Sequence, residues 1–290
     1  MAQIQWFPGH MAKALRQLRE NLKVIDIVFE LVDARIPESS RNPELDEIVA
    51  NKPRLLILEK SDLADPRQTA AWLRYYQAHH QPAIAVDVND RKLVGDLTKA
   101  ARQVLKVQQA HAAEKGIQSR VIRAVVAGIP NVGKSTLLNR LVNKKVAITG
   151  DRPGVTKKQQ WLKAGNDLQL LDTPGILWPK FEDPQVGQKL ALTGAIKDAL
   201  FAKDDIALTA IEFMRSQDQL TRLTDRYHLS TQELDATNVD VLLAITHRLG
   251  FKDDYDRGSE RLIFDLRKGK IGRFTFDTVP TMTQGAADDE

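Results

Sequence analysis

The 290 residues are 42% hydrophobic and 28% charged, which is typical of a globular protein and leaves room for two domains. No run of about 18 apolar residues occurs, which argues against a membrane span, and we expect no signal peptide. Cysteine is absent, which excludes disulfides and thiolate metal sites and suits a cytoplasmic protein.

The net charge is only +4, but the basic residues gather in clusters. Such clusters are typical either of solvated faces or of nucleic-acid surfaces, and both interpretations stay open. The clusters are Lys13, Arg16, Arg19 and Lys23; Lys144, Lys145, Arg152, Lys157 and Lys158; and Arg261, Arg267, Lys268, Lys270 and Arg273.

The N-terminal motif Trp6-Phe7-Pro8-Gly9-His10 precedes a stretch with helical apolar spacing. His10 falls at or near the predicted helix N-terminus, where the helix dipole disfavours the imidazolium form. Its position alone predicts a neutral residue that starts the helix with a local hydrogen bond. The apolar stripe of this helix is Met11, Leu15, Leu18, Leu22 and Ile25.

Apolar strands then alternate with helices, which predicts a doubly wound α/β domain. We expect strands at 25–32, 54–58 and 83–86, with helical spacing through Ala70, Leu73 and Tyr76 and a second helix to about Gln109. The first strand ends in Asp33-Ala34-Arg35-Ile36-Pro37 and the second in Glu59-Lys60-Ser61-Asp62, at the edge where such sheets bind ligands. The polar residues 111–119 are interpreted as a linker.

A strand at 121–126 leads into a complete GxxxxGK[ST] loop, residues 128–135, and a helix from Thr136. Glycines let the backbone wrap phosphates with its N–H groups turned inward. Lys134 can reach the β- and γ-phosphates, and Ser135 can bind Mg²⁺. The chain is therefore expected to bind a nucleoside triphosphate.

Residues 144–160 are polar and turn-rich, and we interpret them as a mobile loop. A hairpin follows, with Gly165-Asn166 as its turn and Leu168 to Leu171 as its second strand. That strand ends in Asp172-Thr173-Pro174-Gly175. Here Asp172 is the expected partner of Mg²⁺, and Gly175 can offer its N–H to the γ-phosphate.

From about Pro184 the pattern becomes helical, which predicts a small second domain. Its amphipathic segments are 191–200, 205–214, 238–249 and 259–266, with a weak extended stretch near 271–276. Residues 281–290 are polar and acidic and predict a disordered tail.

The residues Asp172 to Gly175 favour a GTPase over an ATPase or kinase, and the guanine-reading element, usually [NT]KxD, lies at 59–62 with Glu59 in its first position. Asp62 can accept from guanine N1–H and the 2-amino group, a donor pair that adenine lacks. The aliphatic stem of Lys60 can cover the base. This guanine motif stands before the phosphate loop instead of after it.

That order resembles the circularly permuted GTPases, and nearly the whole chain resembles the ribosome biogenesis GTPase A family. The motifs that carry the resemblance are residues 6–11, 33–37, 128–136, 152–156, 172–175, 192–198 and 267–273. The resemblance implies a cytoplasmic GTPase that binds the large ribosomal subunit in its GTP state and leaves after subunit-stimulated hydrolysis. We expect a monomer that does not bind membranes.

The implied fold is a permuted P-loop GTPase domain at 1–180, its first 24 residues facing the ribosome, then an RNA-binding, ANTAR-like helical domain at 181–280. The implied ligands are GTP or GDP, Mg²⁺ and, through Asn131, K⁺; loop-internal hydrogen bonding is the alternative role of Asn131. The implied catalytic residues are His10, Lys134, Thr156 and Gly175, and the metal ligands are Ser135, Thr156 and Asp172. The implied nucleotide contacts are Glu59, Lys60, Ser61, Asp62, Asn131, Val132, Gly133, Lys134, Ser135, Thr136, Asp172 and Gly175.

Two positions depart from common GTPase patterns. Glu59 stands where the family has Asn, and a carboxylate would repel guanine N7, so we expect weaker guanine binding. Ile176 stands where many GTPases have a water-orienting Gln, and the resemblance implies His10 as the substitute. A nucleotide-gated RNA-binding module with incidental hydrolysis is the alternative function.

Overall fold

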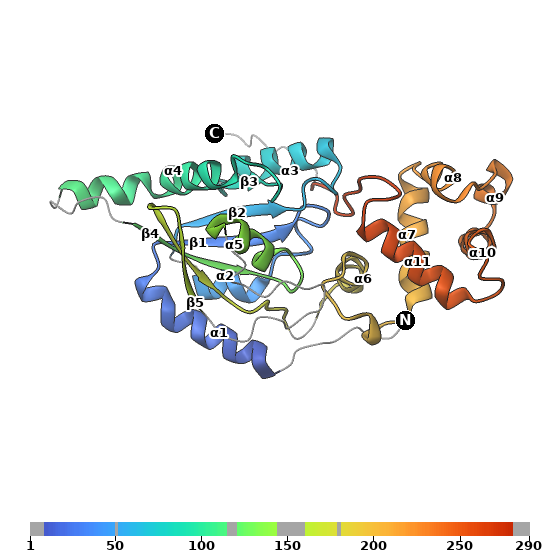
Figure 1. Ribbon diagram of the computed structural model, residues 1–290, viewed down its shortest axis with the longest axis horizontal. Coiled ribbons are helices and arrows are strands. Elements are labelled where there is room, and N and C mark those ends of the chain that lie inside the picture. The colour runs from blue at the N-terminus through green and yellow to red at the C-terminus, as the bar shows by residue number, and fades with distance from the viewer. Residues whose placement is uncertain (1–8, 50–51, 115–120, 144–159, 179–180, 281–290) are drawn as a thin grey trace, which may run out of the picture.

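The computed structural model describes residues 9–49, 52–114, 121–143, 160–178 and 181–280. A six-stranded sheet with the order β3-β2-β1-β4-β6-β5 forms the first part of the chain (Figure 1). Every pairing is parallel except the last, in which β5 runs antiparallel to β6. The predicted mostly parallel α/β fold and the predicted hairpin are confirmed. The strands are β1 (Ile27–Asp33), β2 (Arg54–Glu59), β3 (Ala83–Ala85), β4 (Ile122–Gly128), β5 (Gln160–Ala164) and β6 (Leu168–Asp172).

The sheet is buried on both faces by helices. Leu56 and Leu58 of β2 pack with Trp72 and Tyr76 of α3, whereas the alternate residues of β2 join the larger core. This alternation explains why the central strands consist of nearly continuous apolar runs. The helices of this part are α1 (Gly9–Asn21), α2 (Pro43–Val49), α3 (Pro66–Ala78), α4 (Leu93–Glu114) and α5 (Lys134–Val142).

The second part of the chain is helical and lies beyond the end of the sheet toward which β1 and β2 point (Figure 1). At Gly258 a Cβ atom would lie only 1.9 Å from Thr246 Oγ1, so glycine permits the close approach of α10 and α11 there. The helices are α6 (Pro184–Thr193), α7 (Lys203–Ser216), α8 (Arg222–Tyr227), α9 (Thr231–Asp235), α10 (Asn238–Arg248) and α11 (Tyr255–Arg267). We refer to residues 184–267 as the helical half.

The segment after α11 returns to the sheet and fastens the helical half to it. Phe276 N donates to Arg35 O at 2.6 Å, and Phe274 N donates to Leu63 O at 3.2 Å. The buried carboxylate of Asp277 accepts from Ser39 N and Oγ at 2.8 and 2.6 Å and from Lys189 Nζ at 2.9 Å. The loops after β1 and β2 are thereby held against the helical half.

Several predicted boundaries are wrong. The extended stretch near 271–276 is assigned to no strand and instead bonds to these loops. The helical segment 191–200 is interrupted because Gly194 adopts φ 86° and ends α6. Helix α4 continues to Glu114, into the predicted linker. On α3 the buried face is Thr69, Trp72 and Tyr76, while Ala70 is exposed and Leu73 is only partly buried.

Other predictions concern residues outside the described ranges. These are the mobile loop before β5, which includes Thr156, and the tail 281–290. Among the described helices, none is long and apolar enough to cross a membrane.

Candidate nucleotide site

The predicted phosphate loop connects β4 to α5. Gly128 has φ 153°, and a Cβ atom there would lie 2.5 Å from Leu31 O, so only glycine fits beside β1. Gly133 has φ 119° and directly precedes α5. The positive end of the α5 dipole and the loop's N–H groups therefore lie where phosphates would bind. Along the loop, Val132 is buried, Ser135 is partly buried and Thr136 is exposed.

Lys134 is buried, and its ammonium group is held by the loop itself. Its Nζ donates to Ile129 O at 2.6 Å and to Gly128 O at 3.0 Å. Burial lowers the pKa of Lys134, and the charge of Asp172 opposes this shift. The lysine can thus exchange two neutral carbonyls for phosphate oxygens, a stronger charge-assisted interaction.

Asp172, the last residue of β6, is 1% exposed. Neither of its carboxylate oxygens has a hydrogen-bond partner among the described residues. Burial raises the pKa of Asp172, and Lys134 opposes the shift. Buried carboxylate oxygens rarely lack hydrogen-bond partners, so we expect a cation or a bound water to contact Asp172 here. The residues present therefore fit a Mg²⁺ ion, which takes a hydroxyl, a carboxylate, waters and phosphates as ligands in such sites.

The loop that follows Asp172 packs directly onto the phosphate loop. Ile176 N donates to Gly128 O at 3.1 Å. A Cβ atom at Gly175 would lie 2.7 Å from Pro130 Cα and 3.1 Å from Lys134 Nζ. Ile176 and Leu177 are fully buried, so neither orients water, as the sequence predicts.

Lys60 joins three loops at the other end of the site. Its Nζ donates to Asp33 Oδ2 at 3.0 Å and to Asn131 O at 2.7 Å. Ser61 Oγ donates to Val86 O at 2.8 Å, which fixes the loop, and Asp62 is exposed. This arrangement leaves the Asp62 carboxylate accessible to a base.

Glu59 is 2% exposed and lies against the phosphate loop. A Cβ atom at Gly133 would lie 2.7 Å from Glu59 Cδ, and Glu59 Oε1 has no hydrogen-bond partner in the described part of the chain. Burial raises the pKa of Glu59 to about 7, against the opposing charge of Lys60. From the sequence we expect Glu59 to be an ionised carboxylate. Its burial instead favours the neutral acid, which can donate a hydrogen bond.

Asp33 and Arg35, to which sequence reasoning assigns no role, form a buried ion pair beside Lys60. Arg35 Nε and Nη2 donate to Asp33 Oδ1 and Oδ2 at 2.9 and 2.7 Å. Burial opposes ionisation, but Arg35 and Lys60 hold the pKa of Asp33 far below its usual range. Arg35 Nη2 also donates to Thr193 O at 3.2 Å. The available signal was the position of Asp33 at the end of a buried strand.

Asn131 also reaches the helical half. Its Nδ2 donates to Gly194 O at 2.8 Å, so this hydrogen bond leaves the phosphate loop instead of staying within it. The C-terminal end of α6, with its capping residue Gly194, is thus contacted from both the phosphate loop and the Asp33–Arg35 pair.

Two predicted catalytic residues are not placed. Thr156 lies outside the described residues, and His10 belongs to α1 but its side chain is not described. Among the described residues, no group of three or more His, Cys, Asp or Glu side chains could hold a metal. The candidate Mg²⁺ site therefore depends on phosphate oxygens as well as on the chain.

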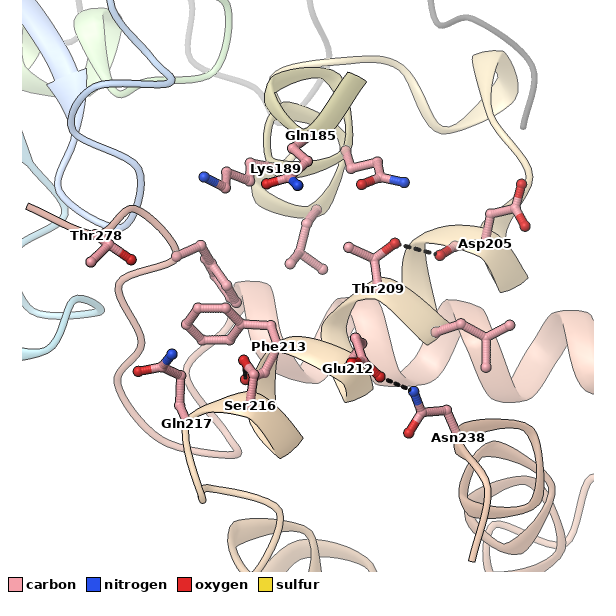
Figure 2. A pocket seen from close by; sticks show the side chains of 14 residues that line it. Gln185, Lys189, Asp205, Thr209, Glu212, Phe213, Ser216, Gln217, Asn238 and Thr278 are labelled. Atoms are coloured by element: carbon pink, nitrogen blue, oxygen red, sulfur yellow. Dashed lines mark hydrogen bonds between the residues drawn. The ribbon is translucent and has the colours of Figure 1, made fainter. Parts of the chain in front are cut away.

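A separate cavity of about 570 Å³ lies in the helical half (Figure 2). Gln185 and Lys189 of α6 line one side and Thr209 and Glu212 of α7 the other; Glu212 accepts from Asn238 Nδ2. Its lining comes from helices and a C-terminal segment instead of a glycine-rich loop.

The fold and the site together define a P-loop GTPase whose predicted guanine loop precedes its phosphate loop. Residues 123–247 match the family model described as 50S ribosome-binding GTPase. Ribosome biogenesis GTPase A of Priestia megaterium is 52% identical, covering 94% of this chain and 96% of that protein. The Bacillus cereus protein of that name is 49% identical over 95% and 94% of the two chains. The chain belongs to the ribosome biogenesis GTPase A family.

More distant relatives and two solved structures are also similar to the chain. Mitochondrial ribosome-associated GTPase 1 of Ictalurus punctatus is 33% identical over 94% of this chain and 92% of its own length. A GDP-bound YlqF structure covers 90% of this chain and 98% of its own, with a TM-score of 0.66 and 24% identity. GNP-bound YlqF from T. maritima covers 92% and 98%, with a TM-score of 0.63 and 22% identity.

Proposed function

We propose that this chain hydrolyses GTP in the assembly of the large ribosomal subunit. The observation that carries the proposal is the convergence of Lys134, Gly175 and the unpaired carboxylate of Asp172 at one sheet edge. Asp62 and Lys60 supply guanine recognition from the loop after β2. Family membership supports the large subunit as partner.

Ser135 and Asp172 would hold Mg²⁺, with Thr156 as a further ligand. The ion would neutralise charge on the phosphates. Lys134 would release the carbonyls of Gly128 and Ile129 to bind phosphate oxygens, and Gly175 would donate its N–H to the γ-phosphate. Asn131 would supply the ligand oxygen if K⁺ takes part, because its amide nitrogen is directed to Gly194.

The buried apolar side chains of Ile176 and Leu177 predict slow hydrolysis by the free protein. His10 would orient the attacking water, once the subunit holds the N-terminal segment in place. Groups supplied in this way accelerate GTPases by about 10³–10⁵.

We further propose that residues 1–180 form the GTPase domain, with 1–24 facing the ribosome, and that 181–280 form the RNA-binding domain. The chain would act as a cytoplasmic monomer that binds the subunit with GTP and leaves with GDP. The hydrogen bonds from Arg35 and Asn131 to Thr193 O and Gly194 O join the two proposed domains beside the candidate nucleotide site.

The test is GTP turnover by the purified chain with and without large subunits, in potassium buffer with Mg²⁺. We expect strong stimulation, competition by GTP but not ATP, and loss of stimulated turnover in His10→Ala. Full stimulated turnover in His10→Ala would remove that residue from the mechanism. Nucleotide-dependent binding to subunits without stimulation would instead support the alternative, a gated RNA-binding module, which Glu59 and the apolar Ile176 favour.

A further inference from the structure

An exposed aromatic residue lies within the basic surface of the helical half. Phe264 in α11 is 42% exposed. Arg261 Cζ lies 5.7 Å and Lys270 Nζ 5.1 Å from the centre of its ring. Phe274 also lies beneath an arginine, Arg222, at 4.6 Å, but it is only 3% exposed and belongs to the core. Phe264 therefore combines a ring open to solvent with two adjacent cations.

The cations around Phe264 are held in place by the next residue, Asp265, which is 0% exposed. Arg226 Nη2 contacts Asp265 Oδ2 at 2.6 Å, Arg261 Nε contacts Oδ1 at 3.1 Å, and Lys270 Nζ lies 3.7 Å from Oδ1. Tyr227 in α8 donates its hydroxyl to the same carboxylate at 3.2 Å. One buried aspartate thus gathers basic side chains from α8, α11 and the segment after α11.

This arrangement differs from an ordinary solvated basic face. Lysine and arginine side chains on such a face move independently, whereas these share a buried anchor. Arg261 and Lys270, the two cations beside the ring, together outweigh the one carboxylate charge of Asp265. A fixed aromatic face with phosphate-binding groups beside it is the combination that proteins use for unpaired nucleotides, because every base has a face that stacks.

We propose that Phe264 is a stacking platform for one unpaired nucleobase of RNA, with Arg261 and Lys270 contacting the adjacent phosphates. The proposal rests on the proposed function in that it takes ribosomal RNA as the partner. It adds the residue that contacts a base and the single-stranded form of the RNA at that contact.

The experiment measures binding of the full chain to a fluorescein-labelled single-stranded 12-mer RNA and to the same sequence as a duplex. Phe264→Leu removes the ring but keeps an apolar side chain at an exposed position, and Phe264→Tyr keeps the ring. The matched control is Trp161→Leu, which removes another exposed aromatic, on β5. Melting temperatures verify that each variant is folded.

We expect Phe264→Leu to weaken single-strand binding on the order of tenfold, with duplex binding unchanged and Phe264→Tyr near wild type. Lys270→Gln should weaken both RNAs and reduce the salt dependence by about one phosphate contact. GTP binding should not change in either variant.

Equal single-strand affinity in wild type and Phe264→Leu would overturn the proposal, as would the absence of any RNA affinity in the wild type. Loss of subunit binding by Phe264→Leu without loss of RNA binding would also overturn it and indicate a ribosomal protein contact. Subunit-stimulated turnover, measured in parallel, reports on the proposed function separately: if it persists while RNA affinity is absent, only the present inference fails.

Discussion

Two buried aspartates, Asp172 at the nucleotide edge and Asp265 in the helical half, have opposite surroundings. Asp172 is 1% exposed, and neither oxygen has a hydrogen-bond partner among the described residues. Asp265 is 0% exposed and is contacted by arginine, lysine and tyrosine side chains. A carboxylate left unpaired in the interior costs stability and is therefore expected where a ligand completes it. Asp265 Oδ1 also has no hydrogen-bond partner among the described residues, but Arg226 and Tyr227 donate to Oδ2, and Arg261 and Lys270 lie within ion-pair distance of Oδ1. A buried carboxylate whose charge is offset by cations of the chain is expected to organise structure.

The first prediction concerns function at the unpaired aspartate. Asp172→Asn should lower Mg²⁺-dependent GTP turnover by about 10²–10³, the usual effect of losing one electrostatic group from a site. The unfolding free energy of the ligand-free protein should change little, because the substitution removes a buried charge without a hydrogen-bond partner but also removes the charge that opposes buried Lys134. Turnover assays and urea denaturation measure the two quantities. A marked loss of stability would mean that Asp172 is a structural residue like Asp265.

The second prediction concerns Arg35, which links the sheet edge to the helical half. It pairs with buried Asp33 and also donates a hydrogen bond to Thr193 O. Arg35→Met should destabilise the protein by about 3–5 kcal/mol, the range for breaking a buried ion pair, with Lys60 offsetting part of the loss. Urea denaturation measures the effect, and Arg67→Met, at an exposed position of α3, is the control. A loss no larger than that of the control would show that the pair contributes nothing to stability.

Asp265→Asn tests the aspartate that is surrounded by cations of the chain. We expect a loss of about 1–3 kcal/mol in unfolding free energy, because charge-assisted hydrogen bonds are replaced by weaker ones and the cations remain partly solvated. GTP affinity should be unchanged, in contrast to Asp172→Asn. Asp253→Asn, whose side chain is 94% exposed, is the matched control. Weaker GTP binding in Asp265→Asn would show that the two regions are coupled.

The features that could be predicted from the sequence are those set by neighbouring residues along the chain. The phosphate loop has glycines at fixed spacing, and the hairpin has a turn between alternating residues, so both were recognisable. The parallel sheet followed from apolar strands that alternate with helices. The break at Gly194 was missed because Ala191 to Leu200 keeps helical apolar spacing across a residue that adopts positive φ.

Long-range contacts and burial were not predictable in the same way. The bond from Arg35 to Thr193 O joins residues 158 positions apart, and no local pattern encodes it. Glu59 was recognised as unusual, but its charge depends on burial against Gly133, which only the folded chain reveals. Sequence reasoning therefore identified most of the candidate site's residues but not the protonation state of Glu59.

The protonation of Glu59 leads to the smallest predicted effect, a change of GDP affinity with pH. With a pKa of about 7, raised by burial, Glu59 is mostly neutral at pH 6 and can donate to guanine N7; at pH 8 it is mostly ionised and repels N7. GDP affinity should therefore fall about tenfold between pH 6 and pH 8, following the neutral fraction. Glu59→Gln, which always carries an amide donor, should lack this dependence and should bind more tightly than wild type at pH 8, as should Glu59→Asn.

The unfolding free energy should also depend on the protonation of Glu59. Because the pKa of Glu59 is raised on folding from 4.5 to about 7, its contribution to stability is complete below pH 4.5 and is lost as pH rises through 7. The difference in unfolding free energy between wild type and Glu59→Gln should therefore change within that interval and level off above it. GDP titrations and urea denaturation at several pH values measure both effects. The same pH dependence for wild type and Glu59→Gln in both experiments would contradict this prediction. Glu59 would then be an ordinary ionised carboxylate, and its charge would weaken guanine binding equally at pH 6 and pH 8.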